Sequence, residues 1–425
     1  MASKIILDNS TTGQITINNV AVTTASVDSA FSLSNSNANN LYNLAANTLN
    51  TSFVNLKSGL SSPNWAYVNS TSTKRSQFMS AYRAMTEQVR TQISYQGYFT
   101  TAAGSYPGTS AYYGGVLLQD GRVFMVPFNA TFARIYNPTT DSNTTPSGSY
   151  AMAGGWWGGV LMRDGRVYMC PYNSTTARIY DPATDTLTTP NGTFPGGAAH
   201  VGGVLLPDGR VYISPAGGTN GTVGRIYDPT SNTLTTTAAL FPSTTSSNCG
   251  CCLTLDGRVL HAPFNSTSLY VYDPVANSTI SFTAGGTGAF RGAVLLPDGR
   301  NYVIPSSSTT GRIVDIASIV ISSIPNANPS GLTYAHIGGV VTADGRVFCT
   351  NQNAPSPSIF DPITLTTIYL SSLISVTANS FSSSVLLKDG RVFMVPQNST
   401  SAKIYTPRTV TVPDSIVLSP FLNKF

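Results

Sequence analysis

Charged residues are scarce in this sequence of 425 residues: Asp, Glu, Lys and Arg together make up 10% of it, against about a quarter in an average soluble protein. Glutamate occurs only at Glu87. The net charge of +5 is small for this length, and the six basic and three acidic residues among the first 96 form no basic patch of the kind that binds nucleic acid. The composition therefore predicts no nucleic-acid partner and a surface kept soluble by Ser, Thr and Asn.

Long apolar runs are also missing. No 18 apolar residues follow one another, so the sequence predicts no membrane span. The run Ile5 to Leu7 is too short for a signal peptide, and we expect a chain made in the cytoplasm without one. In that compartment the Asn-x-Ser/Thr triplets are expected to reflect composition rather than glycosylation; they include Asn69, Asn129, Asn173, Asn265 and Asn398.

The sequence does contain a unit that recurs seven times. Its most constant part is the triplet Asp-Gly-Arg, which begins at Asp120, Asp164, Asp208, Asp256, Asp298, Asp344 and Asp389. A period of about 45 residues is typical of repeat architectures such as propellers.

Each repeat predicts four antiparallel strands, because short β-branched and aromatic runs alternate with turn residues. In the second repeat the strands are expected at Gly159 to Met162, Arg166 to Cys170, Ala177 to Tyr180 and around Leu187. Asp-Gly between the first two runs predicts a type I′ hairpin turn, which needs positive φ at both central residues.

Comparing the seven repeats with one another replaces an alignment. Small residues precede the first strand, as in Gly114-Gly115 and Gly158-Gly159, where seven strands are expected to crowd around an axis. The third strand carries an aromatic residue in every repeat except at Val314, and these rings are expected to fill the space between neighbouring blades; they are Tyr136, Tyr180, Tyr227, Tyr272, Phe360 and Tyr405.

With Asp-Gly-Arg-Val-Tyr followed by Arg-Ile-Tyr-Asp-Pro and a Thr-rich run, the chain resembles kelch-type β-propellers and the central propeller of the galactose oxidase family over roughly residues 97 to 412. The resemblance implies a mainly β fold, a seven-bladed propeller of four-stranded antiparallel blades. Six repeats depart from the kelch pattern by having Pro after the second strand where Gly-Gly is usual. The partners of kelch proteins therefore do not carry over.

Three parts of the chain are predicted: a strand arm at 1–34, a helical segment at 35–96 and the propeller at 97–425. In the arm, two or three short strands are expected within residues 3–25, with a turn at Asn9 to Gly13. Apolar residues at helical spacing predict one helix between Asn37 and Leu60 and another between Lys74 and Tyr95. The last repeat lacks an outer strand, which either Gly97 to Thr101 or Arg408 to Val412 would supply; the register of Phe99 favours the first.

The five cysteines are not spaced as a disulfide framework. Cys249, Cys251 and Cys252, with His261 one hairpin away, have the residue types of a metal site. The repeat comparison favours a different interpretation, because Cys251 and Cys252 occupy positions that hold Gly and Val in other repeats. We therefore expect small buried residues, no metal and no cofactor.

Candidate ligand-binding residues lie eight positions before the triplets, at the start of the first strand, where Asn248 is the one member without a ring. We expect this ring and the polar loops after the second strands to share one surface around the central channel, suited to a sugar. Packing of the same side chains beneath the loops is the alternative. The candidates, with two neighbours one position further on, are Tyr112, Trp156, Trp157, His200, Phe290, Arg291, His336 and Phe381.

A short N-terminal strand-and-helix module before a closed β domain resembles the organisation of bacteriophage and other viral fibre or decoration proteins. That resemblance implies a virion protein, attached to other virion proteins through residues 1–96, whose propeller binds a host surface glycan or receptor. A homo-oligomer is expected, with a trimer by analogy with viral fibres. Two alternatives stay open: a purely structural assembly subunit without ligand, and an enzyme acting on polysaccharide. The chain is expected not to be an enzyme.

Overall fold

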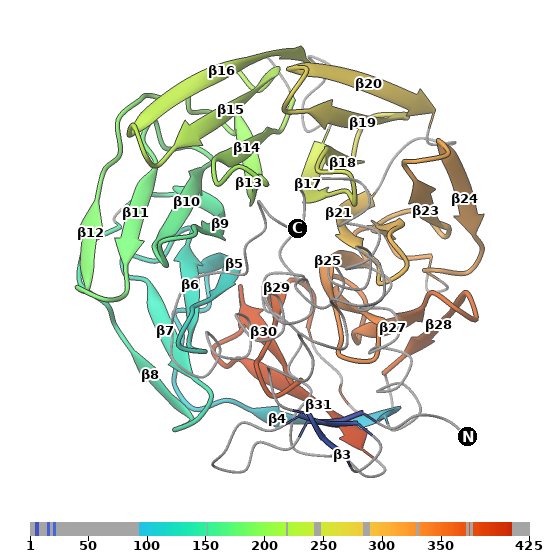
Figure 1. Cartoon of the computed structure of the whole chain (residues 1–425). Helices are drawn as coiled ribbons and strands as arrows, with labels where there is room; N and C mark the ends of the chain where they lie inside the picture. The colour runs from blue at the N-terminus through green and yellow to red at the C-terminus, as the bar shows by residue number, and fades with distance from the viewer. Residues whose placement is uncertain are drawn as a thin grey trace.

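The computed structural model describes residues Ile5–Leu7, Ile15–Ile17, Val20–Val22 and 93–409, apart from short gaps at 151, 218–219, 242–247, 284–289, 329–330, 371–373 and 375–376. Within 93–409 the strands form seven sheets of four antiparallel strands, arranged as blades around one axis (Figure 1). The predicted seven-bladed propeller is therefore confirmed, and no helix occurs in the described ranges.

Each blade is built from the axis outward. The innermost strands are β5 (Tyr112–Leu117), β9 (Trp156–Leu161), β13 (His200–Leu205), β17 (Asn248–Leu253), β21 (Phe290–Leu295), β25 (His336–Val341) and β29 (Phe381–Leu386). The second strands are β6 (Val123–Pro127), β10 (Val167–Pro171), β14 (Val211–Pro215), β18 (Val259–Pro263), β22 (Asn301–Pro305), β26 (Val347–Asn351) and β30 (Val392–Pro396). The third strands are β7 (Arg134–Asn137), β11 (Arg178–Asp181), β15 (Val223–Asp228), β19 (Ser268–Asp273), β23 (Gly311–Asp315), β27 (Ser358–Asp361) and β31 (Lys403–Thr409). The outer strands are β8 (Ser142–Thr144), β12 (Thr186–Thr188), β16 (Thr233–Leu240), β20 (Ser278–Thr283), β24 (Val320–Ile324), β28 (Thr366–Tyr369) and β4 (Ile93–Thr101).

The Asp-Gly-Arg hairpins have a different turn from the predicted type I′. In the first blade the N–H of Gly121 donates to the carbonyl of Leu118 at 3.0 Å, and Gly121 has a φ of 92°, whereas Asp120 has no positive φ. This is the pattern of a three-residue hairpin with a glycine bulge. The Asp carboxylate instead binds the backbone N–H and the guanidinium of Arg122, which closes the turn.

Ring closure follows the predicted register. Strand β4 pairs antiparallel with β31, with Phe99 opposite Tyr405, so the strand that precedes the first blade completes the last one. The closing strand begins at Ile93, and the prediction of helix as far as Tyr95 is therefore wrong for its last three residues. Arg408 and Thr409 extend β31 rather than forming an outer strand, and residues 410–412 lie outside the described part.

The strand arm has the predicted strands. β1 (Ile5–Leu7), β2 (Ile15–Ile17) and β3 (Val20–Val22) form one antiparallel sheet in that order. The turn expected at Asn9 to Gly13 lies outside the described residues. The helix predicted between Asn37 and Leu60, and the helix from Lys74 up to residue 92, lie outside the described residues. In the described part, no helix is long and apolar enough to cross a membrane.

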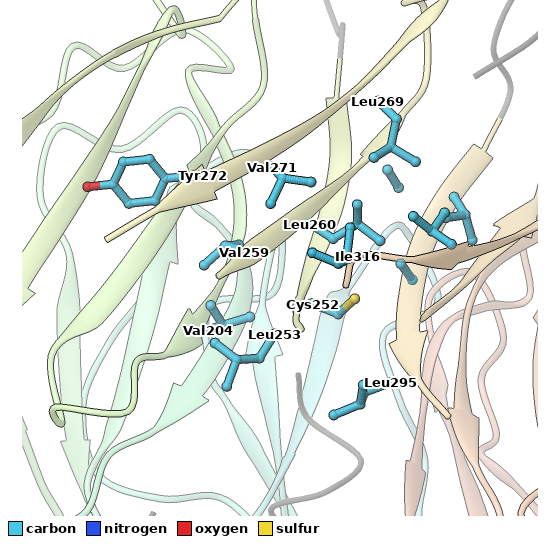
Figure 2. Close-up of a cluster of buried hydrophobic side chains, with 14 of the residues drawn as sticks. Val204, Cys252, Leu253, Val259, Leu260, Leu269, Val271, Tyr272, Leu295 and Ile316 are labelled. Carbon is cyan, nitrogen blue, oxygen red and sulfur yellow. The ribbon is translucent and has the colours of Figure 1, made fainter. Parts of the chain in front are cut away.

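Aromatic rings fill the space between blades, as predicted. The ring of Tyr180 in the second blade stacks on Phe124 of the first at 4.9 Å between centroids. Equivalent pairs link other neighbouring blades; they are Tyr136 with Phe393, Tyr227 with Tyr168, Tyr272 with Tyr212, Phe360 with Tyr302 and Tyr405 with Phe348. Val314, the exception among the third strands, belongs to a core cluster that also contains Leu260 and Cys252. Figure 2 shows the last two of these residues.

Two of the glycines near the axis lie where a side chain would crowd the next blade. A Cβ atom added to Gly114 would lie 2.8 Å from Cα of Gly158, and one added to Gly158 would lie 3.1 Å from Cα of Gly202. Both glycines also have positive φ values, of 98° and 80°. The expected need for small residues at the axis is therefore confirmed at these positions.

Candidate functional site

The innermost strands begin on the same face of the ring on which the loops after the second strands emerge. Tyr112 pairs with Pro127, and Trp156 pairs with Pro171, so the first residue of one strand lies beside the last residue of the next. We call this side the loop face and the side of the Asp-Gly-Arg hairpins the turn face. The strand starts and the polar loops therefore lie on the same face of the ring, as expected, whereas the side chains at the strand starts do not form part of its surface.

The side chains at the first position of these strands are buried. Their exposed fractions are 3% or less; the residues are Tyr112, Trp156, His200, Asn248, Phe290, His336 and Phe381. Trp156 illustrates the reason, because its ring packs edge-on against Tyr150 at 5.9 Å and its Nε1 donates to the carbonyl of Thr176 at 3.1 Å. Tyr106 packs in the same way on Tyr112. These side chains therefore form an interior layer beneath the loops, which is the alternative that the sequence left open, and not an exposed platform.

The histidines in this layer are held neutral by burial. Burial lowers the pKa of His200 and of His336 to about 4. His336 lies 2.9 Å from the hydroxyl of Ser358 through Nε2 and 3.0 Å from the carbonyl of Pro305 through Nδ1. Both nitrogens therefore have protein partners, and this histidine is a structural residue.

The cysteine cluster is likewise structural. Cys252 is buried in the core, and Cys251 lies on the channel wall. His261 lies opposite Cys251 in the strand pair, but its two ring nitrogens contact the hydroxyls of Tyr212 and Ser214, at 3.2 and 3.1 Å. Burial raises the pKa of Cys251 to about 12. Within the described ranges, no group of three or more His, Cys, Asp or Glu residues is placed to hold a metal ion.

One position further along the strands, two aromatic side chains from adjacent blades are in contact. Tyr113 and Trp157, from adjacent blades, have ring centroids 4.4 Å apart. Phe128 and Tyr172, the first residues of the following loops, complete a continuous cluster with centroid distances of 4.4 to 5.9 Å. We call these four residues the aromatic arc. Trp157, a predicted candidate, is half-buried and belongs to it.

Arg291, the second candidate of this kind, belongs to the fifth blade. We call the opening of the channel on the loop face the mouth, and Arg291 lies on the other side of it from the arc. Its guanidinium carbon lies 4.4 Å from the ring centroid of Phe264 and 4.7 Å from that of Tyr334. One terminal nitrogen donates to Oε1 of Gln352 at 2.5 Å. We call these four residues the arginine group, and Arg291 itself is half-buried.

The positive charge of Arg291 acts on the tyrosines of the aromatic arc. Burial raises the pKa of Tyr113 to about 12, and the positive charge of Arg291 opposes that rise. The same charge opposes the burial-driven rise in the pKa of Tyr172 and of Cys249. Gln397 joins the arc, because its Nε2 donates to the hydroxyl of Tyr113 at 2.6 Å.

Below the mouth lies a narrow channel. Its cavity has a volume of about 200 Å³ and is lined mainly by small residues, among them Gly115, Gly159, Cys251 and Ser383. A larger hollow of about 550 Å³ lies on the turn face beside Arg163. Its other charged side chains include Asp164, Asp208 and Arg210, and the last two form an ion pair at 2.7 Å. The mouth therefore differs from this hollow in combining aromatic surface with a cation.

Comparisons with known proteins support the architecture. No family model matches the chain, and no curated protein is significantly similar in sequence. Among solved structures, a streptogramin B lyase matches with a TM-score of 0.61 at 11% identity, covering 74% of this chain and 99% of that one. A fungal alcohol oxidase of the AA5 family in complex with copper matches at 0.57 and 16%, covering 73% and 76%. The WD40 propeller domain of Doa1 matches at 0.56 and 12%, covering 72% and 97%. At these identities the likeness shows the propeller fold alone.

Proposed function

We propose that this chain is a non-enzymatic virion protein of fibre, spike or decoration type, whose propeller binds a host surface glycan at the channel mouth. The aromatic arc carries the proposal. Tyr113, Phe128, Trp157 and Tyr172 place four rings from two blades in mutual contact around the channel. Gln397 adds an amide group beside the rings, and Gln352 of the arginine group adds a second one on the other side of the mouth.

This combination suits a sugar for a simple reason. A pyranose ring has apolar faces of C–H groups and an edge of hydroxyl groups, so it needs a flat apolar surface bordered by hydrogen-bonding groups. Oε1 of Gln397 is buried and has no hydrogen-bond partner among the described residues. The amide lies next to the arc, because its Nε2 contacts the hydroxyl of Tyr113.

Binding of the full chain to a glycan array tests the proposal. Trp157→Ala removes the ring that contacts the other three of the arc and should abolish the array signal. Because loss of a half-buried ring also lowers stability, circular dichroism must show that the variant is folded at the temperature of the array. Tyr98→Ala is the matched control, because Tyr98 is a 55% exposed aromatic residue on the outer strand β4. An array signal that survives Trp157→Ala at full strength would contradict glycan binding at the arc.

The virion setting rests on the organisation of the sequence and is tested separately. Mass spectrometry of purified particles should find this chain in fixed copy number. Sedimentation of the full chain, compared with a chain beginning at Ile93, tests the proposed oligomer and its location in the residues before the propeller. The two alternative functions give other outcomes: a particle subunit that binds no glycan, or an enzyme that shortens a polysaccharide.

A further inference from the structure

Arg291 has a positive charge that the described protein leaves without a counter-ion. The seven arginines of the Asp-Gly-Arg turns each form an ion pair with the Asp of the same turn at 2.5 to 2.7 Å. In the described ranges no carboxylate forms an ion pair with Arg291, and the short gaps within 93–409 contain neither Asp nor Glu. Its Nε is buried without a hydrogen-bond partner there.

The neighbours of Arg291 fix the guanidinium without neutralising it. Phe264 and Tyr334 supply ring surface, and Gln352 accepts one hydrogen bond through its amide oxygen. A planar guanidinium has five N–H donors, so one bond to Gln352 leaves most of them available for a ligand. Arginine held in this way is well suited to an anion that accepts two parallel hydrogen bonds.

Tyr334 occupies a backbone position that the fold otherwise gives to smaller residues. Two positions before the innermost strand, φ is 45° at Ser110, 62° at Gly154, 61° at Ala198 and 57° at Asn379. Tyr334 has a φ of 58° at the same position. A bulky residue is unfavourable in this left-handed region, and such strain concentrates at binding sites. The ring is 42% exposed and lies beside Arg291.

We propose that the glycan bound at the channel mouth is acidic, and that Arg291 binds its carboxylate or sulfate group while the aromatic arc stacks on a sugar ring. Tyr334 orients the guanidinium and covers it from solvent. This inference rests on the proposed glycan binding and adds the chemical class of the ligand. The shared chemistry is an anionic oxygen group on a sugar; carboxylated and sulfated glycans are its two sources.

The test uses the full chain on an array that contains sialylated, uronic-acid, sulfated and neutral glycans. The wild-type chain should bind acidic glycans, and the signal should fall at least tenfold in 0.5 M salt because ion pairing at a half-exposed site is screened. Arg291→Gln should lower the signal for acidic glycans at least tenfold, and Tyr334→Asn about threefold. Arg210→Gln removes one positive charge on the turn face and is the matched control for net charge.

The outcomes separate the two proposals. The sulfated and carboxylated members of the array show which anion is bound. If neutral glycans bind as strongly as acidic ones, or if Arg291→Gln changes the acidic signal less than twofold in a folded chain, the inference fails while glycan binding stands. If Arg291→Gln does not fold, a salt-independent wild-type signal is the result that overturns it. If the wild-type chain binds no glycan, both proposals fail.

Discussion

The hydroxyl of Tyr136 donates to Oδ1 of Asp141 at 2.8 Å, and the same oxygen accepts the backbone N–H of Ala103 at 2.9 Å. Tyr136 and Asp141 belong to the first blade, whereas Ala103 follows β4, the outer strand of the last blade. One carboxylate oxygen therefore connects the two blades between which the ring closes. The next three blades repeat the arrangement at Asp185, Asn232 and Asn277.

Asp141→Ala should lower the free energy of unfolding by about 1 to 3 kcal/mol, because two hydrogen bonds are lost and the hydroxyl of the buried Tyr136 is left without its acceptor. Asp141→Asn keeps an acceptor oxygen and should cost less. Urea unfolding at pH 7 measures both. Equal stability of Asp141→Ala and the wild-type chain would show that the bond does not stabilise the blade junction.

The same bond predicts a dependence on pH. The N–H of Ala103, followed by the hydroxyl of Tyr136, holds the pKa of Asp141 below its ordinary value. The unfolded chain therefore binds this proton more readily than the folded chain does. The stability that ionised Asp141 contributes to the folded chain is complete above the ordinary carboxyl pKa of about 3.9, and it is lost as the pH falls below that value. Asp141→Asn should lack this contribution.

Ring closure by β4 can be tested with one methyl group. A Cβ atom at Gly97 would lie 2.5 Å from the ring of Tyr405 and would also collide with the carbonyl oxygen of Thr406, both on β31. Gly97→Ala should therefore destabilise the chain by about 1 to 3 kcal/mol, as overpacking does. Thermal unfolding measures the change, with Tyr98→Ala as an exposed control on the same strand.

Deleting either of the two segments that could close the ring is a more severe test of closure by β4. Removing residues 96–101 should expose the edge of β31 and promote aggregation, whereas removing the chain from Arg408 onward should be milder. The opposite ranking would contradict closure by β4.

The glycines of the Asp-Gly-Arg hairpins allow a test of the turn geometry. Gly165 has a φ of 88°, and a Cβ atom there would lie 2.8 Å from Oε1 of Gln119. Gly165→Val should lower stability by about 1 kcal/mol or more, because a β-branched residue is strained at positive φ. Gly165→Asn is the control, since Asn tolerates this region better. Unchanged melting of the Val variant would contradict the turn geometry.

The repeats made the blades predictable, because every strand has six counterparts to compare. The orientation of the first residues was not predictable by counting, and a β-bulge is the reason. Tyr112 pairs with Pro127 while Gly115 pairs with Met125, so two residues on one strand lie opposite one residue on the other. Such a bulge reverses the alternation of faces. Tyr112 is therefore buried, and its neighbour Tyr113 joins the arc.

Parts of the mouth depend on contacts between distant blades, which a single sequence does not reveal. Tyr334 precedes the sixth blade, yet its ring reaches Phe264 of the fourth and Arg291 of the fifth. The repeat comparison nevertheless contained a signal for Phe128 and Tyr172. Both follow the Pro that recurs at the end of the second strand, at the position that Phe264 and Gln397 fill in other blades.

The buried histidines give the last prediction. Burial lowers the pKa of His261 to about 3 and that of His200 and His336 to about 4. The unfolded chain takes up these protons near pH 6.5, so between about pH 6.5 and 4 it binds more protons than the folded chain does. Stability should therefore fall as the pH falls through this window, by about 2 kcal/mol for each histidine at pH 5.

His200→Phe tests this most directly, because Phe290 and Phe381 occupy the same position in other blades. Neither nitrogen of His200 has a hydrogen-bond partner of good geometry in the described part, although a weak contact with the backbone of Val223 opposes the fall in its pKa. The variant should be at least as stable as the wild-type chain at pH 7. It should also lose about a third of the stability difference between pH 7 and pH 5, because one of three such protons is removed. Guanidinium unfolding at the two pH values measures this, and an unchanged difference would show that His200 is not a neutral buried group in the folded chain.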